Sequence, residues 1–212
     1  MSDCLESRFH PGHLADLRKS GLSDETILNH GIKSIPPRDI NKIFGYETHA
    51  KSMYEIPYPR TDYSRFKMFY DEADKFNPKT GEERPKYLAK KDSGNRLYIP
   101  IKVRPILKNL STPIYLSEGE KKSLQACQEG LCCIAISGLW NWKIKDKDEL
   151  LPDFDLIALD GRTIYIVPDN DWLLSDRHGK PKNLRHAVYG LAYKLIDRGV
   201  KVSWVELPGG EQ

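Results

Sequence analysis

Residues 114–122 read Ile114-Tyr115-Leu116-Ser117-Glu118-Gly119-Glu120-Lys121-Lys122: an apolar run typical of a strand, then a glutamate, then the start of a helix. A second run of this kind, Thr163–Val167, leads through Pro168 into the acidic string Asp169-Asn170-Asp171. A parallel α/β sheet places all strand ends of this type along one edge, where ligands bind. The sequence therefore predicts that the carboxylates of Glu118, Asp169 and Asp171 lie together and suit Mg²⁺ or Mn²⁺.

Each acidic string also has an ordinary structural interpretation. A glutamate just before a helix is favoured by the helix dipole, and Pro-Asp-Asn-Asp is typical of a turn. For the string Asp169-Asn170-Asp171, a turn and a metal site are equally consistent with the residues. Lys121 and Lys122, on the first helical turn after Glu118, favour the metal site, because they can hold an anion beside the metal.

Strands and helices alternate along the second half of the chain. We expect strands at 114–116, 132–136, 163–167 and 201–205, and helices at 120–128 and 183–198. This alternation predicts an α/β domain over residues 111–212, with a parallel sheet flanked by helices and right-handed crossovers. In residues 1–110 short helices at 10–45 precede a proline- and aromatic-rich region with expected strands at 66–70 and 97–100, so we expect a smaller α+β region there.

Composition and motifs exclude several classes of protein. The 33 Lys+Arg residues face 30 Asp+Glu, and a net charge of +3 alone establishes no polyanionic partner. No apolar stretch is long enough to span a membrane and the N-terminus has no secretory signal, which predicts a cytoplasmic protein without a membrane partner. The four cysteines form no CxxC pair. We therefore expect no zinc site, and the chain carries no P-loop, dinucleotide-binding glycine motif or nucleophile elbow.

Basic and aromatic residues interleave between residues 58 and 104, a stretch that includes Arg65, Lys67 and Arg96. Such a pattern suits phosphate contacts combined with base stacking. A solvated surface with ordinary counter-charges is at least as consistent with the composition. The same two alternatives stay open for Arg177 and Lys180, which follow the aspartates and are candidates for phosphate contact.

The order of these signals resembles a known family. A glutamate after the first strand, a glycine (Gly138) in the loop after the second and Asp-x-Asp after the third together resemble the Toprim domain of bacterial primases, topoisomerases and related nucleases, over about residues 111–207. The runs Pro85-Lys86-Tyr87-Leu88, Ser93–Pro100 and Ser117–Lys122 resemble more closely an uncharacterised Toprim-like family. Members of that family occur in phage and plasmid replication proteins, often ahead of a helicase.

The resemblance implies an enzyme that depends on Mg²⁺ or Mn²⁺ and transfers phosphoryl or nucleotidyl groups. Primase-like activity is the leading interpretation. By position, Glu118 matches the family's acid/base glutamate, and Asp169 and Asp171 match its metal-binding aspartates. The implied partners are single-stranded DNA or RNA, nucleotides and a replicative helicase. The residues implied in catalysis or in binding nucleic acid and nucleotide are Lys121, Lys122, Lys86, Arg96, Gly138, Arg177 and Lys180.

The chain also departs from the primase pattern. No cysteine/histidine zinc-binding module precedes the domain, and Pro168 stands where these families usually have a bulky apolar residue. The chain ends before the further acidic residues that primases carry after the strand expected at 201–205, so we expect it to be part of a longer protein. Two alternatives therefore stand beside the primase-like enzyme: a metal-dependent nuclease with the same site, and a non-catalytic module that binds single-stranded nucleic acid.

Overall fold

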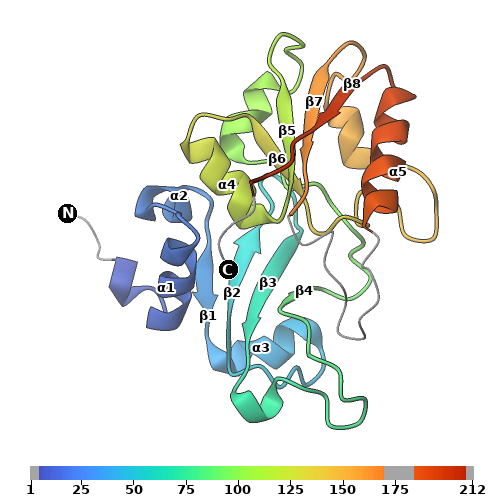
Figure 1. The fold of residues 1–212 in the computed structure, drawn as a ribbon. Helices are drawn as coiled ribbons and strands as arrows, with labels where there is room; N and C mark the ends of the chain where they lie inside the picture. Colours follow the sequence, from blue (N-terminus) through green and yellow to red (C-terminus); the bar gives the residue numbers. More distant parts are fainter. Residues whose placement is uncertain (1–4, 170–183, 209–212) are drawn as a thin grey trace. The chain divides into compact units, whose positions relative to one another are not determined.

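The computed structural model describes residues 5–169 and 184–208, and the chain divides into two compact units, Met1–Ser93 and Gly94–Gln212 (Figure 1). Asp171, Arg177 and Lys180 lie outside the described residues. Within the part of the chain that the structure describes, no helix has both the length and the apolar character that crossing a bilayer requires.

Unit 1 is built on an antiparallel sheet in which the strand order follows the chain, β1-β2-β3-β4. Three α-helices and the short 3₁₀ turns η1 and η2 accompany it. The strands are β1 (Lys33–Ile35), β2 (Ser52–Pro57), β3 (Ser64–Phe69) and β4 (Tyr87–Ala89), and the helices are α1 (Pro11–Lys19), α2 (Asp24–Asn29), α3 (Pro37–Phe44), η1 (Leu5–Ser7) and η2 (Glu72–Asp74). The short helices expected at 10–45 and the strand expected at 66–70 are confirmed.

Polar contacts join the helices of unit 1 to its sheet. The ring of His13 on α1 is buried and lies 2.8 Å from Ser34 Oγ of β1 and 2.9 Å from Ser52 Oγ of β2. The hydroxyl of Tyr54 on β2 donates to Asp16 Oδ2 at 2.7 Å. These buried groups are hydrogen-bonded, as burial of polar atoms requires, and they fix α1 against the two strands.

Unit 2 contains a parallel sheet with the strand order β6-β5-β7-β8. Every neighbouring pair in it is parallel. Its elements are η3 (Ile101–Ile106), β5 (Ile114–Glu118), α4 (Glu120–Gln128), β6 (Cys133–Ile136), η4 (Pro152–Leu156), β7 (Thr163–Val167), α5 (Arg185–Ile196) and β8 (Lys201–Trp204). The expected α/β fold, a parallel sheet flanked by helices, is confirmed.

The connections of unit 2 run in opposite directions from the centre of its sheet. From β5 the chain passes through α4 to β6 on one side, and from β7 it passes through α5 to β8 on the other. Because such crossovers are right-handed, the two helices lie on opposite faces of the sheet, as Figure 1 shows. The boundary between β5 and β7 is therefore a topological switch point, where ligands bind in open α/β sheets.

The segment before β5 packs with unit 2, although we expected the boundary between the two regions at residue 110. Leu97, Ile99 and Val103 are buried in the core of the parallel sheet. The expected strand at 97–100 forms only an isolated bridge, in which Tyr98 and Ala135 exchange two backbone hydrogen bonds of 2.8 and 2.9 Å. Pro100 ends the pairing because it has no N–H to donate, and η3 begins at the next residue.

Candidate functional site

Glu118 is the last residue of β5, at the carboxyl end of the strand. Gly119 follows with φ +91°, a conformation that side-chain-bearing residues rarely adopt. Its N–H donates to Ile136 O of β6 at 2.8 Å, and α4 begins at the next residue. The glycine thus turns the chain into the helix and keeps Glu118 at the edge of the sheet.

Asp169 lies at the same edge, on the other side of the switch point. In the register of the sheet Ser117 of β5 pairs with Val167 of β7. Glu118 lies one residue beyond this pair and Asp169 two residues beyond it, on strands about 4.8 Å apart. The ammonium of Lys122, on the first turn of α4, forms an ion pair with the carboxylate of Asp169. The structure thus brings three of the predicted site residues to one edge.

Gly138 also belongs to this edge, in the loop after β6. A Cβ atom at this position would lie 3.9 Å from Glu118 Oε1 and 3.1 Å from the side-chain nitrogen of Asn141. The second distance is shorter than ordinary van der Waals contact, so a larger side chain would displace Asn141. Glycine therefore lets the loop pass close to Glu118.

Asn141 and Glu120 are polar residues of this region that the sequence did not single out. The side-chain amide of Asn141 donates to Ser137 Oγ at 3.1 Å and accepts from Asn95 at 3.4 Å. Glu120, in the first turn of α4, is only 3 % exposed. Burial, and then the charge of Glu120, raise the pKa of the Tyr98 hydroxyl. For Glu120 the available signal was an acidic residue in a first helical turn, which the helix dipole stabilises.

The donors at this edge are of the type that Mg²⁺ and Mn²⁺ prefer, namely carboxylate oxygens. Across residues 5–169 and 184–208, no group of three or more His, Cys, Asp or Glu side chains is arranged to hold a metal. Glu118 and Asp169 supply two carboxylates from neighbouring strand ends, and the third predicted ligand, Asp171, lies outside the described residues. The chemistry of the two described donors therefore fits such an ion, and the full ligand set stays a prediction.

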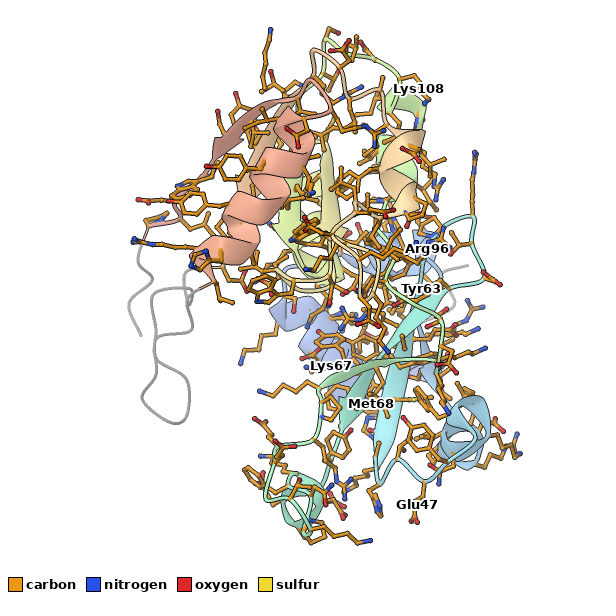
Figure 2. All side chains as sticks on the ribbon, turned by 90° about the vertical axis from the view of Figure 1, so that its right-hand side faces the viewer. Glu47, Tyr63, Lys67, Met68, Arg96 and Lys108 are labelled. Atoms are coloured by element: carbon orange, nitrogen blue, oxygen red, sulfur yellow. The ribbon has the colours of Figure 1, made fainter. Side chains whose placement is uncertain are left out.

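Arg96, which we expected to contact nucleic acid and which is labelled in Figure 2, forms an ion pair within unit 2. Its Nε and Nη2 donate to the carboxylate of Asp153 at 2.7 to 3.0 Å, and the same carboxylate accepts the backbone N–H of Leu97 at 2.9 Å. The Asp153 side chain is 7 % exposed and that of Arg96 35 %. This bidentate contact ties the start of unit 2 to η4, and a role of Arg96 toward nucleic acid stays a prediction.

Lys86 belongs to unit 1, where basic and aromatic side chains share the strands β3 and β4. Lys67 Nζ lies 4.5 Å and Arg65 Cζ 5.0 Å from the centre of the Tyr87 ring, in cation–π contact. Lys67 is labelled in Figure 2. Lys86 is exposed and lies 3.5 Å from Glu83. We call Arg65, Lys67 and Tyr87 the basic–aromatic face of unit 1, which combines positive charge with a ring.

The comparisons with known proteins agree with this architecture. Residues 104–212, which are more than half of the chain, match the DUF3854 family, a domain of unknown function. The chain belongs to this family. No curated protein sequence matches it.

Two solved structures share the fold. One is described as the structure of the DnaG catalytic core, with a TM-score of 0.55 and 19 % identity over 95 % of this chain and 66 % of that one. The other is described as the DnaG primase catalytic domain bound to single-stranded DNA, with a TM-score of 0.56 and 18 % identity over 95 % and 67 % of the two chains. This DUF3854 protein thus spans about two thirds of the length of these primase structures and has their fold. The expected similarity to primase catalytic domains is confirmed for the fold.

Proposed function

We propose that this DUF3854 protein has a Toprim-type metal site at the switch point of unit 2 and acts in DNA replication as a primase-like nucleotidyltransferase. The observation that carries the proposal is the position of Glu118 and Asp169. Glu118 ends β5 and Asp169 lies two residues beyond β7, the neighbouring parallel strand, at the point where the connections of the sheet diverge. This is where α/β sheets bind ligands. The fold shared with primase catalytic domains supports the same assignment.

Glu118, Asp169 and, from the sequence, Asp171 would hold Mg²⁺ or Mn²⁺. When bound, such an ion neutralises charge that develops on phosphate oxygens during transfer. Glu118 is the residue placed to accept the proton of an attacking hydroxyl, because it ends the central strand β5 and borders the Gly138 loop. This assignment gives Glu118 the acid/base role that the Toprim resemblance implies.

Lys122 has a role of its own in this proposal. Its ammonium now neutralises Asp169, and a divalent cation on that carboxylate would replace it. Lys122 is then free to bind a phosphate oxygen of the substrate, because its side chain is 56 % exposed and can reorient. Lys121, the neighbouring cation on the same helical turn, adds positive charge at this end of α4.

Template binding is assigned to the basic–aromatic face of unit 1. Arg65 and Lys67 can contact phosphates while Tyr87 stacks on a base, a combination suited to single-stranded nucleic acid. Exposed Lys86 extends the positive charge at the start of β4. The solved primase domain of similar fold is described as bound to single-stranded DNA, which supports this part of the proposal.

Primer synthesis on single-stranded DNA with Mg²⁺ or Mn²⁺ tests the proposal. We expect Glu118→Gln and Asp169→Asn to lower the rate by about 10³-fold, the size of effect seen when a general base or a charge-stabilising group is removed. Glu129→Gln is the matched control, because Glu129 is exposed and caps the other end of α4. Full activity in both edge variants would refute the site. On a labelled strand, lengthening indicates a polymerase, and shortening the nuclease alternative.

A second candidate is nucleic-acid binding without turnover, and the basic–aromatic face of unit 1 favours it. This candidate predicts an affinity for single strands that falls steeply with salt. It also predicts that chelation of divalent metal leaves the affinity unchanged. Binding that is lost on chelation would exclude this candidate and favour the metal-dependent enzyme.

A further inference from the structure

A groove adjoins the switch point on one face of the parallel sheet. Its volume is about 340 Å³, within the range of about 300–1,000 Å³ that is common for small-molecule sites. Tyr115, Ser117 and Val167 of β5 and β7 line its floor, and Ala126 of α4 and Leu207 beyond β8 line its two sides. We call this cavity the switch-point groove.

The topology of unit 2 explains why the groove exists. α4 lies over β5 and β6, and α5 packs against β8 on the other face, where Tyr189 contacts Trp204. Among the described residues, no helix lies over β7 and β8 on the face that carries α4. Val167 and Val205 are therefore only half-buried there, and the groove occupies the space beside α4.

The lining of the groove combines a fixed aromatic ring with a few polar groups at its edge. The ring of Tyr115 stacks on that of Tyr165 at 5.1 Å and 23° between planes, which holds it in a defined orientation. Most of the remaining surface is apolar, and Gln125 of α4 contributes an amide. Lys122 and Asp169, the ion pair of the proposed metal site, also line the groove.

We infer that the groove binds the base and sugar of a nucleoside triphosphate whose phosphates lie at Lys122 and the switch-point edge. A planar, largely apolar base suits the ring of Tyr115 and the aliphatic walls, and the amide of Gln125 can pair with its polar rim. The charge of Lys122 complements the phosphates. The size of the cavity favours one nucleoside over a peptide helix. This inference rests on the proposed function, since it gives the nucleotide of the transfer reaction a binding site.

Calorimetry with three probes tests the inference: ATP, tripolyphosphate and adenosine, each with and without Mn²⁺. We expect ATP to bind at least tenfold more tightly than tripolyphosphate. Ala126→Trp fills the groove and should weaken ATP at least tenfold while leaving tripolyphosphate and Mn²⁺ binding unchanged. Leu207→Glu, at an exposed position, should weaken ATP several-fold by charge repulsion, and Leu110→Glu, at a leucine of similar exposure in the same unit, is its control.

The outcomes separate the groove from the metal site. Equal affinities for ATP and tripolyphosphate, or ATP binding that neither Ala126→Trp nor Leu207→Glu weakens, would overturn the groove while leaving a Mn²⁺-binding edge intact. Failure of wild-type protein to bind Mn²⁺ would overturn the proposed function instead. In that case adenosine binding that Ala126→Trp leaves unchanged would also refute the groove.

Discussion

The two units of this protein each contain a four-stranded sheet, but they place their polar side chains differently. In unit 1 the strands pair antiparallel in chain order, so successive strands end at opposite edges. His13, Tyr54 and Asp16 meet inside the unit and join a helix to the sheet. In unit 2 the strands are parallel, and Glu118 and Asp169 end at the same edge although they are far apart in the sequence.

This difference teaches that topology, rather than the number of charged residues, decides where a candidate site forms. Both sheets carry acidic and basic side chains. At the switch point of the parallel sheet, two carboxylates, those of Glu118 and Asp169, lie at the edge with the exposed Lys122. In unit 1 the side chains of His13, Tyr54 and Asp16 are hydrogen-bonded to groups of their own unit. We therefore expect changes there to act on stability, and changes at the edge of unit 2 to act on activity.

The largest expected effect on stability comes from breaking the ion pair between Arg96 and Asp153 of unit 2. This pair is not part of the proposed metal site. Asp153→Asn should destabilise unit 2 by about 3 kcal/mol, because it removes a buried, charged acceptor that holds the guanidinium of Arg96 and the backbone N–H of Leu97. All four tryptophans belong to residues 94–212, so tryptophan fluorescence during urea unfolding reports this unit. Asp155→Asn is the control, since Asp155 pairs with Arg198 at the exposed surface. Equal unfolding midpoints for the two variants would contradict the assignment.

The stability of unit 1 should fall at acidic pH because of His13. Burial, reinforced by nearby His10 and opposed by Asp16, lowers the pKa of His13 from 6.5 to about 4. The folded state thus favours the neutral ring, and its stabilisation is complete above pH 6.5 and lost as the pH falls through 4. We expect a loss of about 2 kcal/mol, allowing for partial screening. Amide hydrogen exchange in α1 and β2 at pH 7 and pH 4.5 measures it, and His13→Gln should remove most of the difference. A wild-type pH dependence that survives this substitution would exclude His13 as its source.

Gly138→Ala sharpens the comparison because it changes the edge of unit 2 without adding or removing charge. The added methyl group would push Asn141 aside and approach Glu118. We expect primer synthesis to slow by about tenfold, or about 1.4 kcal/mol in the barrier, with an unfolding midpoint close to that of the wild type. A rate equal to that of the wild type would show that the position of this loop does not matter to the reaction.

The smallest expected effect belongs to the basic–aromatic face of unit 1. Lys67→Ala should weaken the binding of single-stranded DNA a few-fold and lower the slope of log affinity against log salt by about one. Lys33→Ala is the control, because Lys33 is a lysine of the same sheet that lies outside this face and pairs with Glu55 on β2. If both variants bind single-stranded DNA as tightly as the wild type at low salt, the basic–aromatic face is not the binding surface.

The sequence predicted the parallel sheet well because local patterns determine it. β7 and α4 begin and end where the apolar runs and the glycines indicate, and Gly119 marks the turn between β5 and α4. The prediction that Glu118 and Asp169 share an edge followed from the same alternation. These features depend on residues close together in the chain, and the α/β topology then supplies the convergence.

The features that the sequence missed depend on contacts between distant residues. The ion pair between Arg96 and Asp153 joins residues that are far apart in the chain, and no local sequence pattern indicates such a pair. The strand expected at 97–100 has the composition of a strand, yet only Tyr98 finds a pairing partner. Asn141 carries no distinctive motif, and only the fold shows that it lies beside Gly138 and Glu118.

The most direct test of the central claim is calorimetric titration of Mn²⁺ into the wild type, Glu118→Gln, Asp169→Asn and Lys122→Gln. The proposal predicts one ion for the wild type and at least tenfold weaker binding for each carboxylate variant. Binding should be tighter in Lys122→Gln, because the ammonium that competes for Asp169 is gone. Identical affinities in all four proteins, or no Mn²⁺ binding by the wild type, would contradict a metal site at the switch point of unit 2.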